Sequence, residues 1–112
     1  MPPKRLRFTP DQLEPLTAEV GTCIASDKIV VDGEAVGFMV REASTGPRDS
    51  GWRFFSGSES LDYMNDPSKL GVHELNLLAN CDRDVVPLLA APIGSAFERA
   101  GDELVETLAE LP

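Results

Sequence analysis

The stretch of sequence that most strongly predicts the fold is residues 22–42, TCIASDKIVVDGEAVGFMVRE. It contains a short apolar run at 23–26 and three β-branched residues at 29–31, followed by Asp32-Gly33, a dipeptide typical of hairpin turns. Beyond the turn, Val36, Phe38 and Val40 alternate with other residues, so they would share one face of a strand. The segment therefore predicts a β-meander from about residue 22 to residue 42.

A second strand is predicted after the polar loop ASTGPRDS at residues 43–50. Trp52 and Phe54 would share one face of this aromatic strand, and Arg53 and Phe55 the other. Alternating aromatic residues beside Gly51 are typical of a core strand, so we expect Trp52 to be largely buried. Tryptophan and arginine are also common anchors at protein interfaces, which leaves a partner-facing role open for this segment.

The remaining elements are short. Thr9-Pro10-Asp11-Gln12 predicts a helix start with a capping box. Further helices are expected at 58–64, at 72–79 and after Asp82 or Asp84, and a strand at 93–99. The last segment fits either a helix or a strand returning from a break at residues 100–102. Together these elements predict an α+β domain in which an antiparallel β-meander or sheet is accompanied by several short helices.

Composition limits the function. A chain of 112 residues fits a single domain, and 19 acidic against 10 basic side chains give a formal net charge of −9. Such a charge repels phosphate backbones, so we expect no nucleic-acid partner, whereas a basic protein would be attracted. The sequence has no secretory signal pattern and no apolar run near the roughly 20 residues of a membrane span. We therefore expect a cytoplasmic protein that does not enter a membrane, in which Cys23 and Cys81 are buried, unlinked thiols.

No motif for catalysis, cofactor binding or metal binding is recognisable. His73 is the only histidine, and a lone histidine on a short element is more often solvated than catalytic. The loop from Asp66 resembles a calcium loop at its first positions, but Leu70 and Leu77 replace the ligands that the site needs. Ser95 lacks the glycine pattern of a nucleophile elbow. We therefore expect no catalytic residue, no cofactor and no metal.

The order of several sequence strings resembles a known bacterial family. These strings are SDKIVVDG at 26–33, VGFMVRE at 36–42 and DSGWRFFSG at 49–57, followed by shorter matches through IGSAFER at 93–99. They are similar to the thirty-third class of immunity proteins in polymorphic toxin systems, a family first catalogued as a domain of unknown function. The resemblance implies a small α+β protein that binds and neutralises a bacterial toxin, and it brings no catalytic residues.

The resemblance also suggests how the single domain, residues 1–112, is organised. Residues 22–99 would form the family-like core, preceded by a loose, basic lead-in at 1–8 and followed by a variable C-terminal element at 100–112. The prediction is a non-enzymatic protein-binding module whose partner is a basic toxin such as a nuclease. The alternative is a stand-alone cytoplasmic domain with a housekeeping or small-ligand-binding role, which could act as a homodimer; an enzyme is the third hypothesis. The candidate partner-binding residues are Arg41, Trp52, Arg53, Asp62, Asp66, Asp82 and Asp84.

Overall fold

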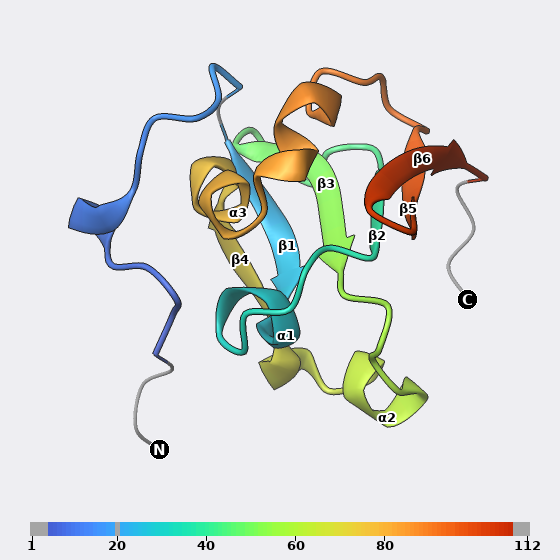
Figure 1. Ribbon diagram of the computed structural model, residues 1–112, viewed down its shortest axis with the longest axis horizontal. Helices are drawn as coiled ribbons and strands as arrows, with labels where there is room; N and C mark the ends of the chain where they lie inside the picture. The colour runs from blue at the N-terminus through green and yellow to red at the C-terminus, as the bar shows by residue number, and fades with distance from the viewer. Residues whose placement is uncertain (1–4, 20, 109–112) are drawn as a thin grey trace.

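The computed structural model describes residues 5–19 and 21–108. Six strands form one sheet in the order β4-β1-β3-β2-β5-β6, in which β1 and β3 are parallel and all other neighbours are antiparallel (Figure 1). The α+β class, with a mostly antiparallel sheet and several short helices, is thereby confirmed. The strands are β1 (Thr22–Ser26), β2 (Phe38–Arg41), β3 (Asp49–Phe55), β4 (Leu70–Glu74), β5 (Ala96–Ala100) and β6 (Glu103–Thr107). The helices are α1 (Asp27–Val30), α2 (Leu61–Met64) and α3 (Leu75–Cys81), with 3₁₀ helices η1 (Pro10–Gln12), η2 (Pro67–Lys69) and η3 (Arg83–Leu88).

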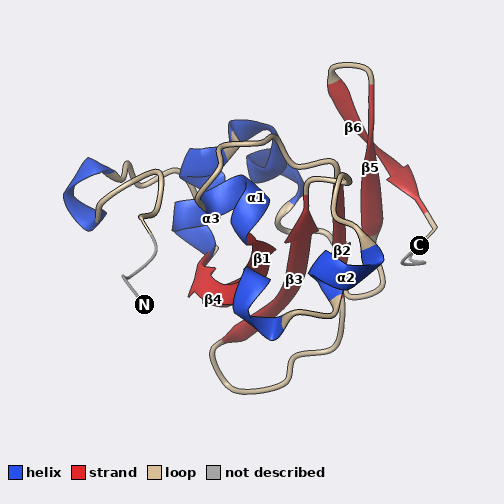
Figure 2. Cartoon of the chain, turned by 90° about the horizontal axis from the view of Figure 1, so that it is seen from below, coloured by secondary structure: helices blue, strands red, loops and turns tan. Residues whose placement is uncertain are grey.

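The core lies on one face of the sheet, beneath α1, α3 and η3 (Figures 1 and 2). Trp52 and Phe54 from the central strand β3 point into it, and both are fully buried. The Trp52 indole N–H donates to the carbonyl oxygen of Leu89 at 3.0 Å, so its one polar atom is satisfied inside the core. The Phe54 and Phe97 rings lie with their centroids 6.0 and 6.4 Å from the Trp52 ring. The predicted burial of Trp52 is confirmed.

The predicted meander at residues 22–42 is wrong in its middle. Residues 27–30, which include Ile29 and Val30, form the short helix α1, and β1 pairs with β3 and β4 instead of turning back on β2. The Ser26 side chain caps the helix by accepting a hydrogen bond from the Lys28 N–H at 3.1 Å. Ile29 and Val30 are fully buried, so packing overrides their β propensity. Gly33, with φ +84°, lies just past the helix and ends it instead of forming a hairpin.

Other predicted boundaries also change. Residues 70–74 form an edge strand, so the helix predicted at 72–79 begins only at Leu75. The helix predicted from Ser58 begins at Leu61 and is capped by Ser60, while the strand predicted from residue 93 begins at Ala96. Near the C-terminus the strand alternative is the one observed, since β6 returns on β5. Residues 109–112 of the predicted C-terminal element, like residues 1–4 of the lead-in, lie outside the described residues.

The segment before β1 lies against α3 through side-chain amides. The capping box at η1 is present, with the Thr9 N–H donating to the Gln12 side chain at 2.8 Å. Asn76 and Asn80 of α3 accept from the backbone N–H groups of Leu16 and Glu14 at 3.0 Å each. Arg7 in the lead-in donates its backbone N–H to the Val30 carbonyl at 2.8 Å and its guanidinium to the Cys81 carbonyl at 2.9 Å. The described part of the lead-in is therefore bound to the core.

The Trp52→Ala variant should lose about 3–5 kcal/mol of unfolding free energy, the usual range for removing a large core aromatic. The variant would leave a cavity against Phe54 and Phe97 and would remove the shorter of the two hydrogen bonds to the Leu89 carbonyl, which keeps only the 3.5 Å bond from Arg41. Denaturant melts followed by circular dichroism measure the loss. Leu61→Ala is the control, because this side chain is 75% exposed and its removal should change stability by less than about 0.5 kcal/mol. A Trp52→Ala loss no larger than that of the control would contradict the core assignment.

Candidate functional site

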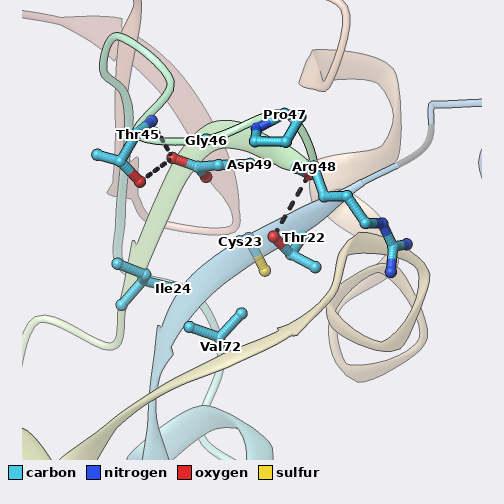
Figure 3. A pocket seen from close by; sticks show the side chains of 9 residues that line it. All are labelled: Thr22, Cys23, Ile24, Thr45, Gly46, Pro47, Arg48, Asp49 and Val72. Atoms are coloured by element: carbon cyan, nitrogen blue, oxygen red, sulfur yellow. Dashed lines mark hydrogen bonds between the residues drawn. The ribbon is translucent and has the colours of Figure 1, made fainter.

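A preformed groove lies on the face of the sheet opposite the helical core. Its volume is about 330 Å³, and Figure 3 shows the β2–β3 loop forming one side while β1 and β4 form the floor. Val72 on the floor is 68% exposed although it stands beside Ile24 in the strand register. The residues lining the groove are Thr22, Cys23, Ile24, Thr45, Gly46, Pro47, Arg48, Asp49 and Val72.

A buried ion pair fixes the loop wall of this groove. The guanidinium of Arg53 binds both carboxylate oxygens of Asp49, with Nη1–Oδ1 at 2.9 Å and Nη2–Oδ2 at 2.8 Å. Asp49 also accepts from the Thr45 N–H at 2.9 Å and hydroxyl at 3.0 Å, and from the Gly51 N–H at 3.0 Å. Arg53 reaches Glu42 at the other end of the loop, with Nε–Oε2 at 3.3 Å. The pair therefore ties the loop to β3 at several points.

The backbone geometry at Gly51 explains why a glycine precedes Trp52 in the sequence SGWRFF at residues 50–55. Its φ is +88°, and a Cβ added there would lie 2.1 Å from the carbonyl oxygen of Glu42. The Gly51 carbonyl in turn accepts from the Glu42 N–H at 2.8 Å. This close approach brings the two ends of the loop together beside Arg53, so residues 51–54 of the motif serve the loop closure and the core.

Arg41 and Arg53 lie on opposite faces of the sheet. Arg41 points toward the core, where its guanidinium stands over the Trp52 ring at 5.7 Å and donates to the Ala91 carbonyl at 2.7 Å. Its Nε also donates to the Ser50 carbonyl at 2.9 Å. Arg53 is only 6% exposed and Trp52 is fully buried. These three candidate residues therefore support the site from within, and Trp52 and Arg53 offer almost no surface for a partner.

The four candidate aspartates fall into two separated pairs. Asp62 is exposed in the first turn of α2, and Asp66 caps η2 by accepting from the Ser68 N–H at 3.0 Å. Asp82 and Asp84 flank the start of η3, where both bind Arg99 at 2.8 Å. Asp82, although a candidate partner-binding residue, has a side chain that is only 9% exposed. Its carboxylate accepts from the Val36 N–H at 2.9 Å and the Asp84 N–H at 3.0 Å, and so joins three elements.

Sequence reasoning missed Asp49 and the groove itself. Asp49 stands in a polar loop pattern, and nothing in its neighbours indicates a buried partner four residues later. The groove requires the parallel β1–β3 contact and the strand at 70–74, neither of which the sequence pattern predicts. The motif from Ser50 to Phe55 was the available signal, because arginine between two core aromatics is unusual for a half-buried strand.

The surroundings of Cys23, Cys81 and Asp49 shift the pKa values of these three side chains. Cys23 and Cys81 are free and buried, as predicted, and burial raises the pKa of both thiols above the ordinary value, so they remain protonated. The Arg53 guanidinium lowers the pKa of Asp49 far below its usual range, so Asp49 remains a carboxylate. Within residues 5–19 and 21–108, no three His, Cys, Asp or Glu side chains gather as a metal-binding group. Nor does any helix of that described part have the length and apolarity to cross a membrane.

Fold and site together define a small α+β protein with a groove whose loop wall is held by the contacts of Asp49 and Arg53. Comparison with known families then shows which kind: the chain matches the immunity protein Imm33 domain over residues 23–108 and belongs to that family. The resemblance carried by the strings between residues 26 and 99 is thus confirmed. Neither a curated protein nor a solved structure shows significant similarity to the chain. The family indicates a role in toxin immunity and a protein partner.

The stability contributed by Asp49 should decline in acid. Because its folded pKa is lowered by Arg53, the contribution is complete above the unfolded pKa of about 4 and is lost as pH falls toward the folded pKa. Asp49→Asn does not titrate at this position. The difference in unfolding free energy between the native protein and this variant should therefore narrow by about 1 kcal/mol between about pH 6 and pH 3. Urea melts across this range measure it; a constant difference would contradict the ion-pair assignment.

Gly51→Ala should destabilise the protein by about 2 kcal/mol or more, since it combines strain at positive φ with a backbone clash at Glu42. Thermal melts measure the loss. The matched control is Gly46→Ala in the same loop, because an added Cβ at Gly46 meets nothing within 4 Å. Equal losses in the two variants would show that Gly51 has no special part in closing the loop.

Proposed function

We propose that this protein is a non-enzymatic immunity protein that neutralises a bacterial toxin by binding it and covering its active site. Membership of the Imm33 family over residues 23–108 is the observation that carries the proposal. The described residues supply a rigid framework with a preformed groove, held by Arg53 and Asp49. A site of this kind needs no proton transfer or nucleophile, because steric exclusion of the toxin's substrate suffices. We place this action in the cytoplasm of the protected cell.

The acidic charge supports a basic toxin as the partner. The formal net charge is −9, and the exposed acids include Asp62 and Asp84. Opposite charges steer two proteins together and raise the association rate above the unsteered value of about 10⁵–10⁶ M⁻¹s⁻¹. Asp82 is excluded from this steering role, because its side chain is only 9% exposed and also binds the Val36 backbone, whereas Asp84 shares Arg99 with it but is 59% exposed.

The test begins by finding which genes adjacent to the one for this protein encode a toxin domain, so that its product can be used as the partner. Co-expression of the two proteins should restore growth of cells that the toxin alone kills, and the purified pair should form a stable complex. Gly51→Ala serves as the loop variant and Gly46→Ala as its control in the same growth assay. Growth arrest despite equal amounts of the folded immunity protein would overturn the proposal, as would rescue without any detectable complex.

Association with this toxin should slow by at least about tenfold as salt rises from low to high concentration, while dissociation changes little. Asp62→Asn combined with Asp84→Asn should slow association at low salt, because it removes exposed negative charge. Arg83→Gln is the control, because it removes a positive charge instead of a negative one. The Arg83 side chain is 63% exposed, so its replacement should speed association. Stopped-flow or surface binding kinetics measure these rates. Rates that are equal in all variants and at all salt concentrations would show that the acids serve solubility alone.

A further inference from the structure

The sheet ends in a strand that no other described strand covers. β6 is the last strand in the order and pairs only with β5, to which Gly101-Asp102 connects it through a tight turn. Gly101 has φ +64°, as a two-residue hairpin turn with glycine first requires. Figures 1 and 2 show the β5–β6 hairpin at the side of the molecule opposite α3, and in Figure 2 its turn extends away from the body.

The register determines which backbone groups of β6 point outward. The Arg99 N–H donates to the Gly37 carbonyl at 2.8 Å, so the odd-numbered residues of β5 turn their backbone groups toward β2. The even-numbered residues of β5 therefore bond to β6, through the pairs Glu98–Val105 and Ala100–Glu103. Alternation then leaves the N–H and C=O groups of Leu104 and Glu106 directed to the open edge.

The exposed charged side chains of this hairpin are all acidic. Glu98, Glu103 and Glu106 are exposed on the two strands, and Asp102 is exposed in the turn. The one base of the hairpin, Arg99, is occupied by Asp82 and Asp84 at 2.8 Å each. The open edge therefore presents backbone hydrogen-bonding groups amid uncompensated negative charge.

Exposed apolar side chains accompany the edge. Val105 is 41% exposed on the strand, and Ile93 and Leu108 are 62% and 74% exposed. Ile93 and Leu108 line a shallow hollow of about 530 Å³ together with Ser95, Glu106 and Thr107. An extended segment added to β6 would thus find apolar contacts beside its hydrogen-bonding partners.

We propose that β6 is a docking edge for an extended segment of the toxin that carries basic residues on both faces, with apolar residues between them, and adds to the sheet as a seventh strand. This inference rests on the proposed function and names the surface and the chemistry of the partner. Main-chain bonds to Leu104 and Glu106 would supply affinity, and lysine or arginine opposite Glu103 and Glu106 would supply selectivity.

Charge distinguishes this partner from a second copy of the chain. Pairing of two β6 strands would bring the exposed acids of this hairpin, Glu98, Glu103 and Glu106, close to the same acids of the other copy. Like charges on facing strands are destabilising, and charged side chains are a common protection of exposed edges against self-pairing. A basic strand removes this repulsion and gains attraction from the same residues.

Glu106→Pro tests the backbone part of the proposal. Proline removes the outward N–H of an exposed residue whose backbone makes no bond to β5, so the hairpin itself should remain intact. Glu106→Thr is the matched control, because it also removes the carboxylate but keeps the N–H. Affinity for the toxin should fall about tenfold more in the proline variant than in the threonine variant. Equal affinities would overturn the docking edge while leaving the immunity function standing.

Synthetic peptides test the edge without the toxin. A short valine-based peptide with lysine on both faces of the extended strand should shift the amide NMR signals of Leu104 and Glu106 and slow their hydrogen exchange, whereas the same peptide with glutamate in place of lysine should not. The double variant Glu103→Lys with Glu106→Lys reverses the charge but keeps the N–H groups of residues 104 and 106. This variant should bind the glutamate peptide in preference to the lysine peptide. The proposal fails if the lysine peptide leaves both signals unchanged at millimolar concentration, or if both peptides bind alike. It also fails if sedimentation shows a dimer that Glu106→Pro dissociates, since β6 would then pair with its own copy.

Discussion

The buried pair of Arg53 and Asp49 is the interaction on which the open side of this molecule depends. A buried ion pair costs desolvation, and it is favourable only when its geometry is good and its remaining hydrogen-bonding sites are filled. Both conditions hold here: the contact is bidentate at 2.8 and 2.9 Å, and Asp49 accepts three further hydrogen bonds from Thr45 and Gly51. Because a neutral residue could not hold the loop at so many points, the charges stabilise one loop conformation and thereby preform the groove.

One strand serves both faces of the sheet. On β3, Trp52 and Phe54 fill the helical core, while the alternate residue Arg53 holds the loop on the other side. Arg41 of β2 lies over the Trp52 ring and donates a hydrogen bond to the Ala91 carbonyl. Arg41 therefore packs on the core face of the sheet, opposite Arg53. The sequence SGWRFF therefore contributes both to the packing of the core and to the position of the β2–β3 loop. A shift of β3 on one face would displace the side chains on its other face as well.

The class of fold and the aromatic strand could be predicted from sequence because they depend on local alternation and turn residues. Ile29 and Val30 could not be placed, since β-branched side chains satisfy a buried helix as well as a strand once tertiary packing covers them. Val72 was misplaced for the opposite reason: its helical spacing with Leu75 is real, but the chain changes from strand to helix between the two. The groove was beyond prediction, because it arises from the non-local pairing of β1 with β3 and β4.

The acidic side chains fall into two groups, those whose carboxylates form ion pairs within the fold and those whose carboxylates are exposed. Asp49 and Asp82 are occupied by arginines and backbone N–H groups, so their charge is largely neutralised within the fold. The acids of the β5–β6 hairpin, Glu98, Glu103 and Glu106, form no ion pair with a base in the described part of the chain, because Arg99 is turned toward η3. The external field of the protein is therefore set by fewer acids than the composition suggests. Since part of that field surrounds an unpaired strand edge, selection of a basic partner and protection from self-pairing follow from the same side chains.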